Sequence, residues 1–168
     1  DPNTVEVDGK RISGEKVLIA TGSRPAVPAI EGLDAVPYLT SDLLTVDEPL
    51  ELRELPKSLL IIGGGYIALE LGQMFSRLGT VVTILERSGQ LLTHGYDPEV
   101  GRSIGEVLGQ EGLQMLFSAT PQSTRQDGND IATTVTVDGR ERVIRTEHLL
   151  IATGRRPNTD NIRVERAG

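Results

Sequence analysis

The sequence has 168 residues, of which 38% are hydrophobic and 24% charged, a composition typical of one ordinary globular domain. A formal net charge of −7 argues against a surface for DNA or RNA, and no apolar run approaches the ~20 residues that cross a bilayer, so neither nucleic acid nor membrane is expected as a partner. The sequence contains no cysteine, which excludes disulfides, thiolate metal sites and a cysteine nucleophile within it. No signal-peptide pattern is visible, so a cytoplasmic location is expected.

An internal repeat links the two ends of the sequence. Residues 4–9 read TVEVDG and residues 134–139 read TVTVDG, while residues 17–25 read VLIATGSRP and residues 149–157 read LLIATGRRP. Each copy has the pattern of a hairpin with an Asp-Gly turn and a return strand that ends in Ala-Thr-Gly. Only the second copy follows a complete nucleotide-binding pattern. We therefore expect residues 1–24 to close an upstream domain of the same kind, and the sequence to be a piece of a longer protein.

The middle of the chain begins with a buried strand and a glycine turn. Residues 58–62 (SLLII) predict a short strand buried on both faces of a parallel sheet. Three glycines follow, and then a helix that we expect to end at Gly79. Residues 81–85 (VVTIL) predict a second buried strand, which ends at Glu86. The residues expected on the buried face of the helix are Ile67, Leu71, Met74, Phe75 and Leu78.

This order of strand, glycine turn, helix, strand and acid matches the dinucleotide-binding fingerprint. Gly63 would allow the tight turn, Gly65 would leave room for a pyrophosphate, and Ala68 would keep the helix close to the strand. The start of the helix offers N–H groups and the positive end of its dipole to the phosphates. Glu86 lies 21 residues after Gly65, near the ~20 expected for an acid that binds a ribose 2′-hydroxyl.

A second helix and a third strand follow. Asp97 is a good N-cap and Pro98 suits the first helical position, which predicts a helix over residues 98–111 that ends at Gly112. Residues 113–117 (LQMLF) then predict a third parallel strand.

The last part of the chain predicts a β-meander over residues 121–148. Its turns are expected at the two Asp-Gly pairs, residues 127–128 and 138–139. Residues 149–152 would return to the parallel sheet and place Gly154 at its carboxyl edge, where open α/β sheets bind ligands. The fold class predicted is therefore α/β, with a Rossmann-like dinucleotide-binding domain that has a central parallel sheet and a β-meander.

The two Ala-Thr-Gly returns, together with the stretches IIGGGYIALELGQMF and VTILERS, resemble the flavoprotein disulfide reductases. Within that family, the stretches ALELGQMFSRLGT, THGYDPEV and ATGRRPNT are most similar to the mercuric reductases. The resemblance covers nearly the whole chain and implies its domain organisation. Residues 1–24 and 156–168 would be short segments of an FAD-binding domain, and residues 25–155 would form the NAD(P)H-binding domain.

The resemblance also implies roles for individual residues. Tyr66 would shield the flavin until nicotinamide displaces it, with packing over the glycine turn as the alternative. Glu70 would lie by the nicotinamide carboxamide, with a solvated or ion-paired carboxylate as the alternative. The residues expected to bind a cofactor are Gly63, Gly64, Gly65, Tyr66, Ile67, Ala68, Glu70, Glu86, Arg87 and Gly154, together with Thr21, Gly22 and Arg155 near the flavin nucleotide or the domain junction.

In the reaction that the resemblance implies, hydride passes from NAD(P)H to FAD, and electrons then pass to a cysteine pair and a final acceptor. For the mercuric reductases that acceptor is Hg(II). The cysteine pair would lie outside this sequence, so these residues alone are expected to be inactive and to contain neither a catalytic residue nor a metal site. The longer protein is expected to be a homodimer.

Several alternatives stay open at this stage. Glu86 favours NAD, whereas Arg87 could pair with the 2′-phosphate of NADP and Ala68 is frequent in NADPH-using relatives, so NADP is expected with NAD as the alternative. A dihydrolipoamide dehydrogenase-like enzyme is the alternative within the family. A non-catalytic nucleotide-sensing Rossmann module is the alternative from another class.

Overall fold

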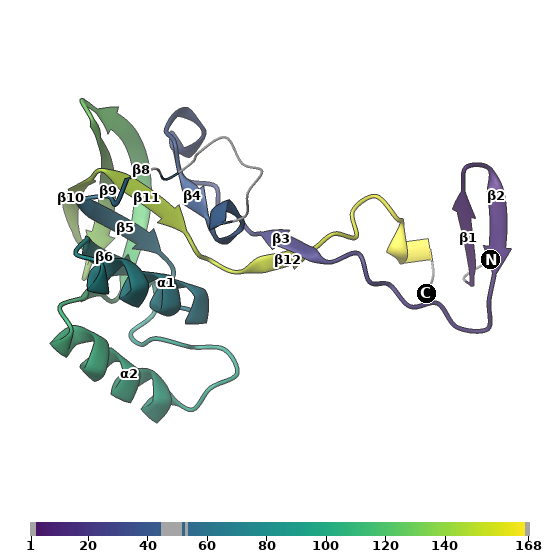
Figure 1. Cartoon of the computed structure of the whole chain (residues 1–168), viewed down its shortest axis with the longest axis horizontal. Helices are drawn as coiled ribbons and strands as arrows, with labels where there is room; N and C mark the ends of the chain where they lie inside the picture. The colour runs from purple at the N-terminus through teal and green to yellow at the C-terminus, as the bar shows by residue number, and fades with distance from the viewer. Residues whose placement is uncertain (1–2, 45–51, 53, 167–168) are drawn as a thin grey trace. The chain divides into compact units, whose positions relative to one another are not determined.

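The computed structural model describes residues 3–44, 52 and 54–166, which form two compact units (Figure 1). The first unit combines the residues up to Arg24 with those from Arg155 onward, and the second runs from Pro25 to Gly154. The parts of the expected domains at 1–2, 45–51, 53 and 167–168 lie outside the described residues. Which cofactor each unit binds stays a prediction.

The second unit is built on a five-stranded parallel sheet with the order β4–β11–β5–β6–β7. The strands β5 and β6 have the predicted bounds because continuous runs of Leu, Ile and Val suit a strand that is buried on both faces. The third predicted strand is shorter than expected. The bounds are β4 (Leu39–Thr40), β5 (Ser58–Ile62), β6 (Val81–Leu85), β7 (Gln114–Leu116) and β11 (His148–Ile151).

Alternate residues of β5 pack into two different hydrophobic clusters, one on each face of the sheet. Leu59 and Ile61 join the cluster that contains the helix residues, whereas Leu60 and Ile62 join the cluster that contains the meander residues. The unit therefore has three layers, with the helices and the meander on opposite faces of the sheet (Figure 1). This arrangement confirms the α/β class.

The helices α1 (Tyr66–Arg77) and α2 (Pro98–Gln110) begin and end close to the predicted residues. The Asp97 side chain caps α2 by accepting a hydrogen bond from the Glu99 amide, with an N···O distance of 2.9 Å. Gly79, with a φ of +107°, ends α1 in a Schellman motif in which the Thr80 amide donates to the Phe75 carbonyl. No helix among the described residues is long and apolar enough to span a membrane.

The predicted buried face of α1 is wrong in part. Of its five residues, Phe75 is buried, Ile67 and Leu71 are partly buried, and Met74 and Leu78 are exposed. The helix places its small residues on the sheet instead, because a Cβ added at Gly72 would already lie 3.2 Å from the Ile84 Cδ1 atom. The prediction followed side-chain bulk, whereas the close helix–sheet approach requires small residues. The buried positions are Ala68, Leu69, Gly72 and Phe75.

The β-meander lies at the predicted place with shifted bounds. It consists of β8 (Ala119–Asp127), β9 (Asp130–Val137) and β10 (Arg140–Thr146), which pair antiparallel in the order β10–β9–β8. The second turn is Asp138-Gly139, as predicted. The first turn is centred one residue later than predicted, on residues 128–129, because Asp127 pairs with Asp130.

The first unit contains two small pairs of strands, β1 (Thr4–Val7) with β2 (Lys10–Ser13) and β3 (Ser23–Pro25) with β12 (Arg155–Pro157). The predicted hairpin turn at Asp8-Gly9 is confirmed. The return strand expected after it is not formed, since residues 17–22 have no strand and Leu18 is 90% exposed. In the second copy β11 is hydrogen-bonded between β4 and β5, whereas no described strand lies beside residues 17–22. Three short 3₁₀ helices complete the described elements: η1 (Leu33–Ala35), η2 (Ser41–Leu44) and η3 (Val164–Arg166).

Candidate functional site

The glycine turn lies between the carboxyl end of β5 and the start of α1. The Gly63 amide donates to the Leu85 carbonyl at the end of β6, with an N···O distance of 2.8 Å. Gly154 follows β11, the other neighbour of β5 in the sheet. Because these strands are parallel, the turn and Gly154 lie at the same carboxyl edge, which is where open α/β sheets bind ligands.

Gly63 is required by the fold of the chain itself. Its φ of +116° is unfavourable for any residue with a side chain. A Cβ atom at this position would also lie 2.4 Å from the Ala152 carbonyl oxygen. The tight turn predicted for Gly63 is therefore present.

Gly64 packs closely against two side chains of the segment that follows β6. A Cβ atom there would lie 2.6 Å from the Glu86 Oε2 atom and 3.0 Å from the Leu91 Cδ2 atom. Gly64 is buried, so no open space remains on that side for a side chain.

Gly65 is different, because nothing in the described residues requires it to be glycine. Its φ of −82° and ψ of 174° suit any residue, and an added Cβ would meet no atom within 4 Å. The missing side chain leaves a cradle beside the first turn of α1. A pyrophosphate fits this arrangement, since it needs close approach to the backbone at a helix N-terminus.

The start of α1 offers hydrogen-bond donors beside that cradle. The first bond inside the helix runs from the Leu69 amide to the Gly65 carbonyl, with an N···O distance of 3.1 Å, and no side chain caps the helix. The amides of Tyr66, Ile67 and Ala68 therefore have no partner in the described part of the chain. Together with the positive end of the helix dipole they suit a diphosphate anion. The Ala68 side chain is fully buried against the sheet.

The Glu86 carboxylate is bound within the protein. Its Oε2 atom accepts a hydrogen bond from the Gly64 amide and its Oε1 atom one from the Ser88 amide, both with N···O distances of 2.8 Å. The Ser88 hydroxyl hydrogen is shared between Oε1 and the Gln90 carbonyl. Arg87, by contrast, is exposed and has neither a hydrogen bond nor an ion pair with any described residue.

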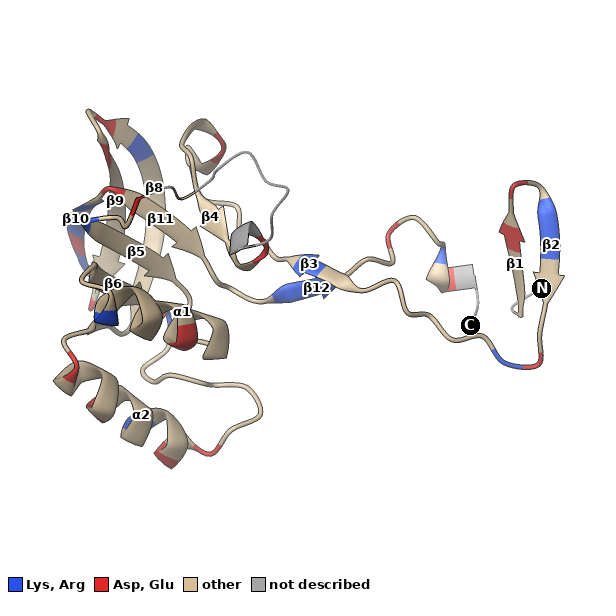
Figure 2. Ribbon diagram, in the orientation of Figure 1, with Lys and Arg blue, Asp and Glu red and all other residues tan. Residues whose placement is uncertain are grey.

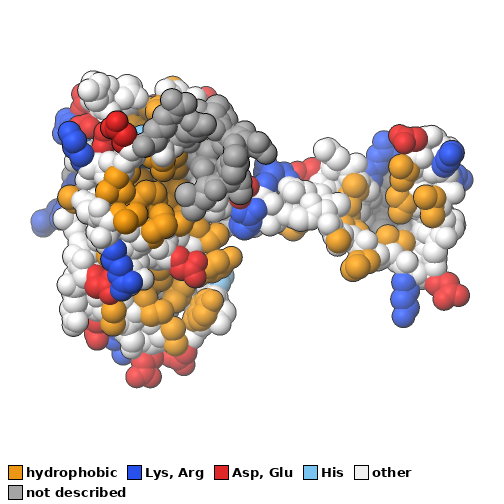
Figure 3. Space-filling view, viewed as in Figure 1, with side chains coloured by type: hydrophobic (Ala, Val, Ile, Leu, Met, Phe, Trp, Pro, Cys, Tyr) orange, Lys and Arg blue, Asp and Glu red, His pale blue; other side chains and the backbone are white. Residues whose placement is uncertain are grey.

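Two residues with predicted roles at the nicotinamide end lie on the first turns of α1. Tyr66 is the first residue of the helix and 54% exposed, so its ring is not buried over the glycine turn. Glu70 is exposed one turn further along. In the space-filling view hydrophobic side chains gather beside α1, where Met74 and Leu78 are also exposed (Figure 3).

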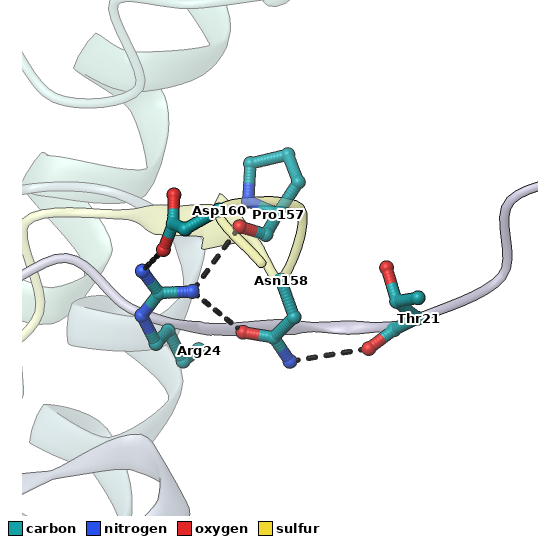
Figure 4. A network of polar contacts seen from close by, with 5 residues as sticks. All are labelled: Thr21, Arg24, Pro157, Asn158 and Asp160. Atoms are coloured by element: carbon teal, nitrogen blue, oxygen red, sulfur yellow. Dashed lines mark hydrogen bonds and ion pairs between the residues drawn. The ribbon is translucent and has the colours of Figure 1, made fainter. Parts of the chain in front are cut away.

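In the first unit, one polar network joins Thr21 and Arg24 to residues 157–160 (Figure 4). The Asn158 amide donates to the Gly22 carbonyl at 3.0 Å, and its Nδ2 atom donates to the Thr21 carbonyl at 3.2 Å. Arg24 donates to the Asn158 Oδ1 atom at 2.8 Å and forms an ion pair with Asp160. Both predicted residues are thus held in place by Asn158.

The strands β3 and β12 both contain basic residues (Figure 2). Arg155 donates from Nε to the Ser23 Oγ atom at 2.9 Å and from a terminal nitrogen to the Ser23 carbonyl at 2.7 Å. In the second unit the Gly154 carbonyl accepts from the Ala26 amide at 2.9 Å. The predicted residues Gly154 and Arg155 therefore help to hold the chain where it enters and leaves the second unit.

Sequence reasoning missed three residues that shape these sites. Ser88 stands two positions after the fingerprint acid, so its position was a usable signal. Arg24 and Asn158 are adjacent to the two Ala-Thr-Gly repeats, but their contact joins positions 134 residues apart and has no local pattern. Among the described residues no group of three or more His, Asp or Glu side chains could hold a metal ion.

Comparison with known proteins gives close relatives over the full length of the chain. It is 45% identical over 168 residues to a mercuric reductase from Staphylococcus aureus, covering 100% of the chain and 30% of that protein. It is 33% identical over 173 aligned residues to a dihydrolipoyl dehydrogenase from Geobacillus stearothermophilus, covering 100% of the chain and 35% of that protein. The chain thus spans about a third of the length of these relatives.

A solved structure has the same fold. The HOCl-induced flavoprotein disulfide reductase from Escherichia coli matches with a TM-score of 0.76 and 33% identity, over 99% of this chain and 37% of that one. The sequence profile of the pyridine nucleotide-disulphide oxidoreductases matches residues 1–168. The chain therefore belongs to the pyridine nucleotide-disulphide oxidoreductase family.

Proposed function

We propose that the second unit binds the nicotinamide dinucleotide of an FAD-dependent oxidoreductase. The observation that carries this proposal is the cradle at Gly65, which no described residue fills and which adjoins three unpartnered helix amides. A purely structural glycine turn would explain Gly63 and Gly64 but not Gly65. For the same reason a domain without a nucleotide is disfavoured.

The residues around the cradle have distinct proposed tasks. The amides of residues 66–68 hold the pyrophosphate, and the helix dipole offsets part of its charge. Tyr66 and Glu70, exposed on the same helix start, face the nicotinamide end of the ligand. When bound, NAD(P)H supplies the hydride that FAD accepts and passes as electrons to a cysteine pair elsewhere in the longer protein.

The domain assignment follows from the same proposal. Residues 25–155 form the NAD(P)H-binding domain, and residues 1–24 and 156–168 belong to an FAD-binding domain. Thr21 and Gly22 are proposed to lie near the flavin nucleotide, and Gly154 and Arg155 near the cofactor where the two domains meet. The hydrogen bonds of Asn158 to Thr21 and Gly22 support this by fixing the backbone of that segment. The chain itself has no cysteine, so it is expected to show no turnover without the rest of the protein.

We further propose that the longer protein is a cytoplasmic homodimer that reduces Hg(II) to Hg(0). The support is the 45% identity to a mercuric reductase, against 33% to a dihydrolipoyl dehydrogenase. NADPH is the proposed donor because the exposed Arg87 guanidinium has no described partner and matches the geometry of a 2′-phosphate. A dihydrolipoamide dehydrogenase that uses NADH is the second candidate, favoured by an acid at the position of Glu86.

A test of this proposal uses the full-length protein. Oxidation of NADPH would be followed by its near-ultraviolet absorbance with excess thiol, with and without Hg(II), and again with NADH and lipoamide. Oxidation of NADPH that depends on Hg(II) is the expected result. Turnover with NADH and lipoamide, and none with Hg(II), would assign the protein to the second candidate.

A further inference from the structure

The segment from Glu86 to Leu92 holds Gly64 through both of its backbone polar groups. The Gly64 amide donates to the Glu86 Oε2 atom at 2.8 Å, and the Gly64 carbonyl accepts from the Leu92 amide at 3.0 Å. Gly64 is buried, so each of these groups would lack a partner without this segment. The middle of the glycine turn is therefore fixed by the chain that follows β6.

The lack of a side chain at Gly64 has a specific structural reason. A Cβ atom there would overlap the Glu86 Oε2 atom at 2.6 Å and would lie 3.0 Å from the Glu86 Cγ atom. The Glu86 side chain therefore fills the space that a side chain at position 64 would need. Its carboxylate points at the turn because the amide of Gly64 is its partner.

The rest of the Glu86 carboxylate is also in use. Ser88 donates to Oε1 from its amide at 2.8 Å, and its hydroxyl hydrogen is shared between Oε1 and the Gln90 carbonyl, whose oxygen lies 3.1 Å from Oγ. Two amides and this shared hydroxyl use up to three of the about four acceptor positions of the carboxylate, so most of its hydrogen-bonding capacity serves the protein itself. Arg87 lies between these two residues in sequence and has no partner among the described residues.

We propose that Glu86 is a positioning residue that holds the glycine turn in its pyrophosphate-binding shape, and that this role, more than any contact with the ribose 2′ position, determines its effect on nucleotide binding. This inference rests on the proposed nucleotide site. It adds to the role usually given to an acid at the end of this strand, which is to accept a hydrogen bond from an unmodified ribose. Ser88 assists by keeping the carboxylate directed at Gly64.

The experiment compares Glu86→Gln and Ser88→Ala with the parent in the full-length protein. Dissociation constants of NADPH and NADH would be measured by titration, and hydrogen–deuterium exchange of the peptide that contains Gly64 would be followed without nucleotide. A glutamine amide has one acceptor oxygen, so it can serve Gly64 or Ser88 but not both. Glu106→Gln is the matched control, since Glu106 is exposed on α2 and has no described partner.

A positioning role predicts that both nucleotides weaken together. In Glu86→Gln the two dissociation constants should each rise about tenfold, while their ratio stays within about threefold of the parent. The Gly64 peptide should exchange faster in that variant. Ser88→Ala should change the same quantities in the same direction by less, and Glu106→Gln should change none.

Two results would overturn the inference. The first is a Glu86→Gln variant that binds NADPH more tightly and NADH more weakly, with the ratio of the two dissociation constants changed about tenfold or more, because Glu86 would then act mainly through the 2′ position. Unchanged exchange at Gly64 would show that the carboxylate does not hold the turn. If the parent binds neither nucleotide, the proposed function fails, and the exchange measurement still decides the positioning role.

Discussion

Replacing Gly65 by alanine separates a ligand-binding glycine from a structural one. The new Cβ atom would meet nothing within 4 Å, and the backbone angles at this position suit alanine. Gly65 is the N-cap residue of α1, and alanine is less favourable than glycine at that position. This preference alone should lower the free energy of unfolding by at most about 1 kcal/mol. The methyl group would instead occupy the cradle proposed for the pyrophosphate.

The effect on nucleotide binding should be larger than the effect on stability. A pyrophosphate held away from the helix amides loses hydrogen bonds to a charged group, each worth about 1.5–3 kcal/mol. A loss of ~2 kcal/mol corresponds to a rise of roughly thirtyfold in the dissociation constant. Titration calorimetry with NADPH on the full-length protein measures this, and thermal unfolding without nucleotide measures the stability.

Gly63→Ala is the control variant, because it replaces a glycine that the fold itself requires. At Gly63 the added Cβ would lie 2.4 Å from a backbone carbonyl oxygen, and the φ of +116° is strained for alanine. This variant should therefore lose stability before any ligand is added. The reasoning is refuted if Gly65→Ala binds NADPH as tightly as the parent, or if it unfolds as readily as Gly63→Ala.

Three further predictions concern stability, acid sensitivity and flavin retention. Thr133 is fully buried in the meander and its hydroxyl has no hydrogen-bond partner among the described residues. Thr133→Val should therefore raise the free energy of unfolding by about 1 kcal/mol in denaturant titrations, whereas a decrease would indicate a bound water. Hydrogen bonds from Arg77 hold the pKa of the Glu111 carboxyl below its ordinary value, so Arg77→Gln should raise that pKa in an NMR titration. The pKa of Glu111 is lower in the folded state than in the unfolded state, so the Arg77–Glu111 pair stabilises the fold at pH values above the ordinary carboxyl pKa. The difference in the free energy of unfolding between parent and variant should therefore vanish as the pH falls through the lowered pKa. Asn158→Ala removes the side-chain bond to Thr21, so the full-length variant should release flavin at a lower denaturant concentration than the parent, measured by flavin fluorescence; equal release would contradict the role given to this contact.

The parts of the fold that were predictable from sequence are those with a local cause. The continuous apolar runs of β5 and β6, the Asp97 cap and the Gly79 helix end each depend on a few neighbouring residues. The return strand expected over residues 17–22 failed because a strand needs a partner, and the sequence pattern does not show whether one is present.

The candidate site was predicted in its position but not in its contacts. The spacing of the fingerprint located the turn, the helix and the acid correctly. It did not show that Glu86 is bound to an amide 22 residues earlier, because that contact depends on the rotamer of one side chain in the folded chain. The buried face of α1 was misassigned for a different reason. Close packing of the helix on the sheet favoured Gly72 over larger neighbours.

The hydrogen bond between Ala26 and Gly154 has a consequence for how such proteins can be assembled. It joins the second residue of the second unit to the last one, so the two ends of that unit lie side by side. A unit with adjacent ends can be inserted into a loop of a host domain at little cost, because the loop closes over no greater distance than before. The same property makes residues 25–154 a natural cassette, which could be exchanged between related enzymes or fused to a reporter through a single pair of short linkers.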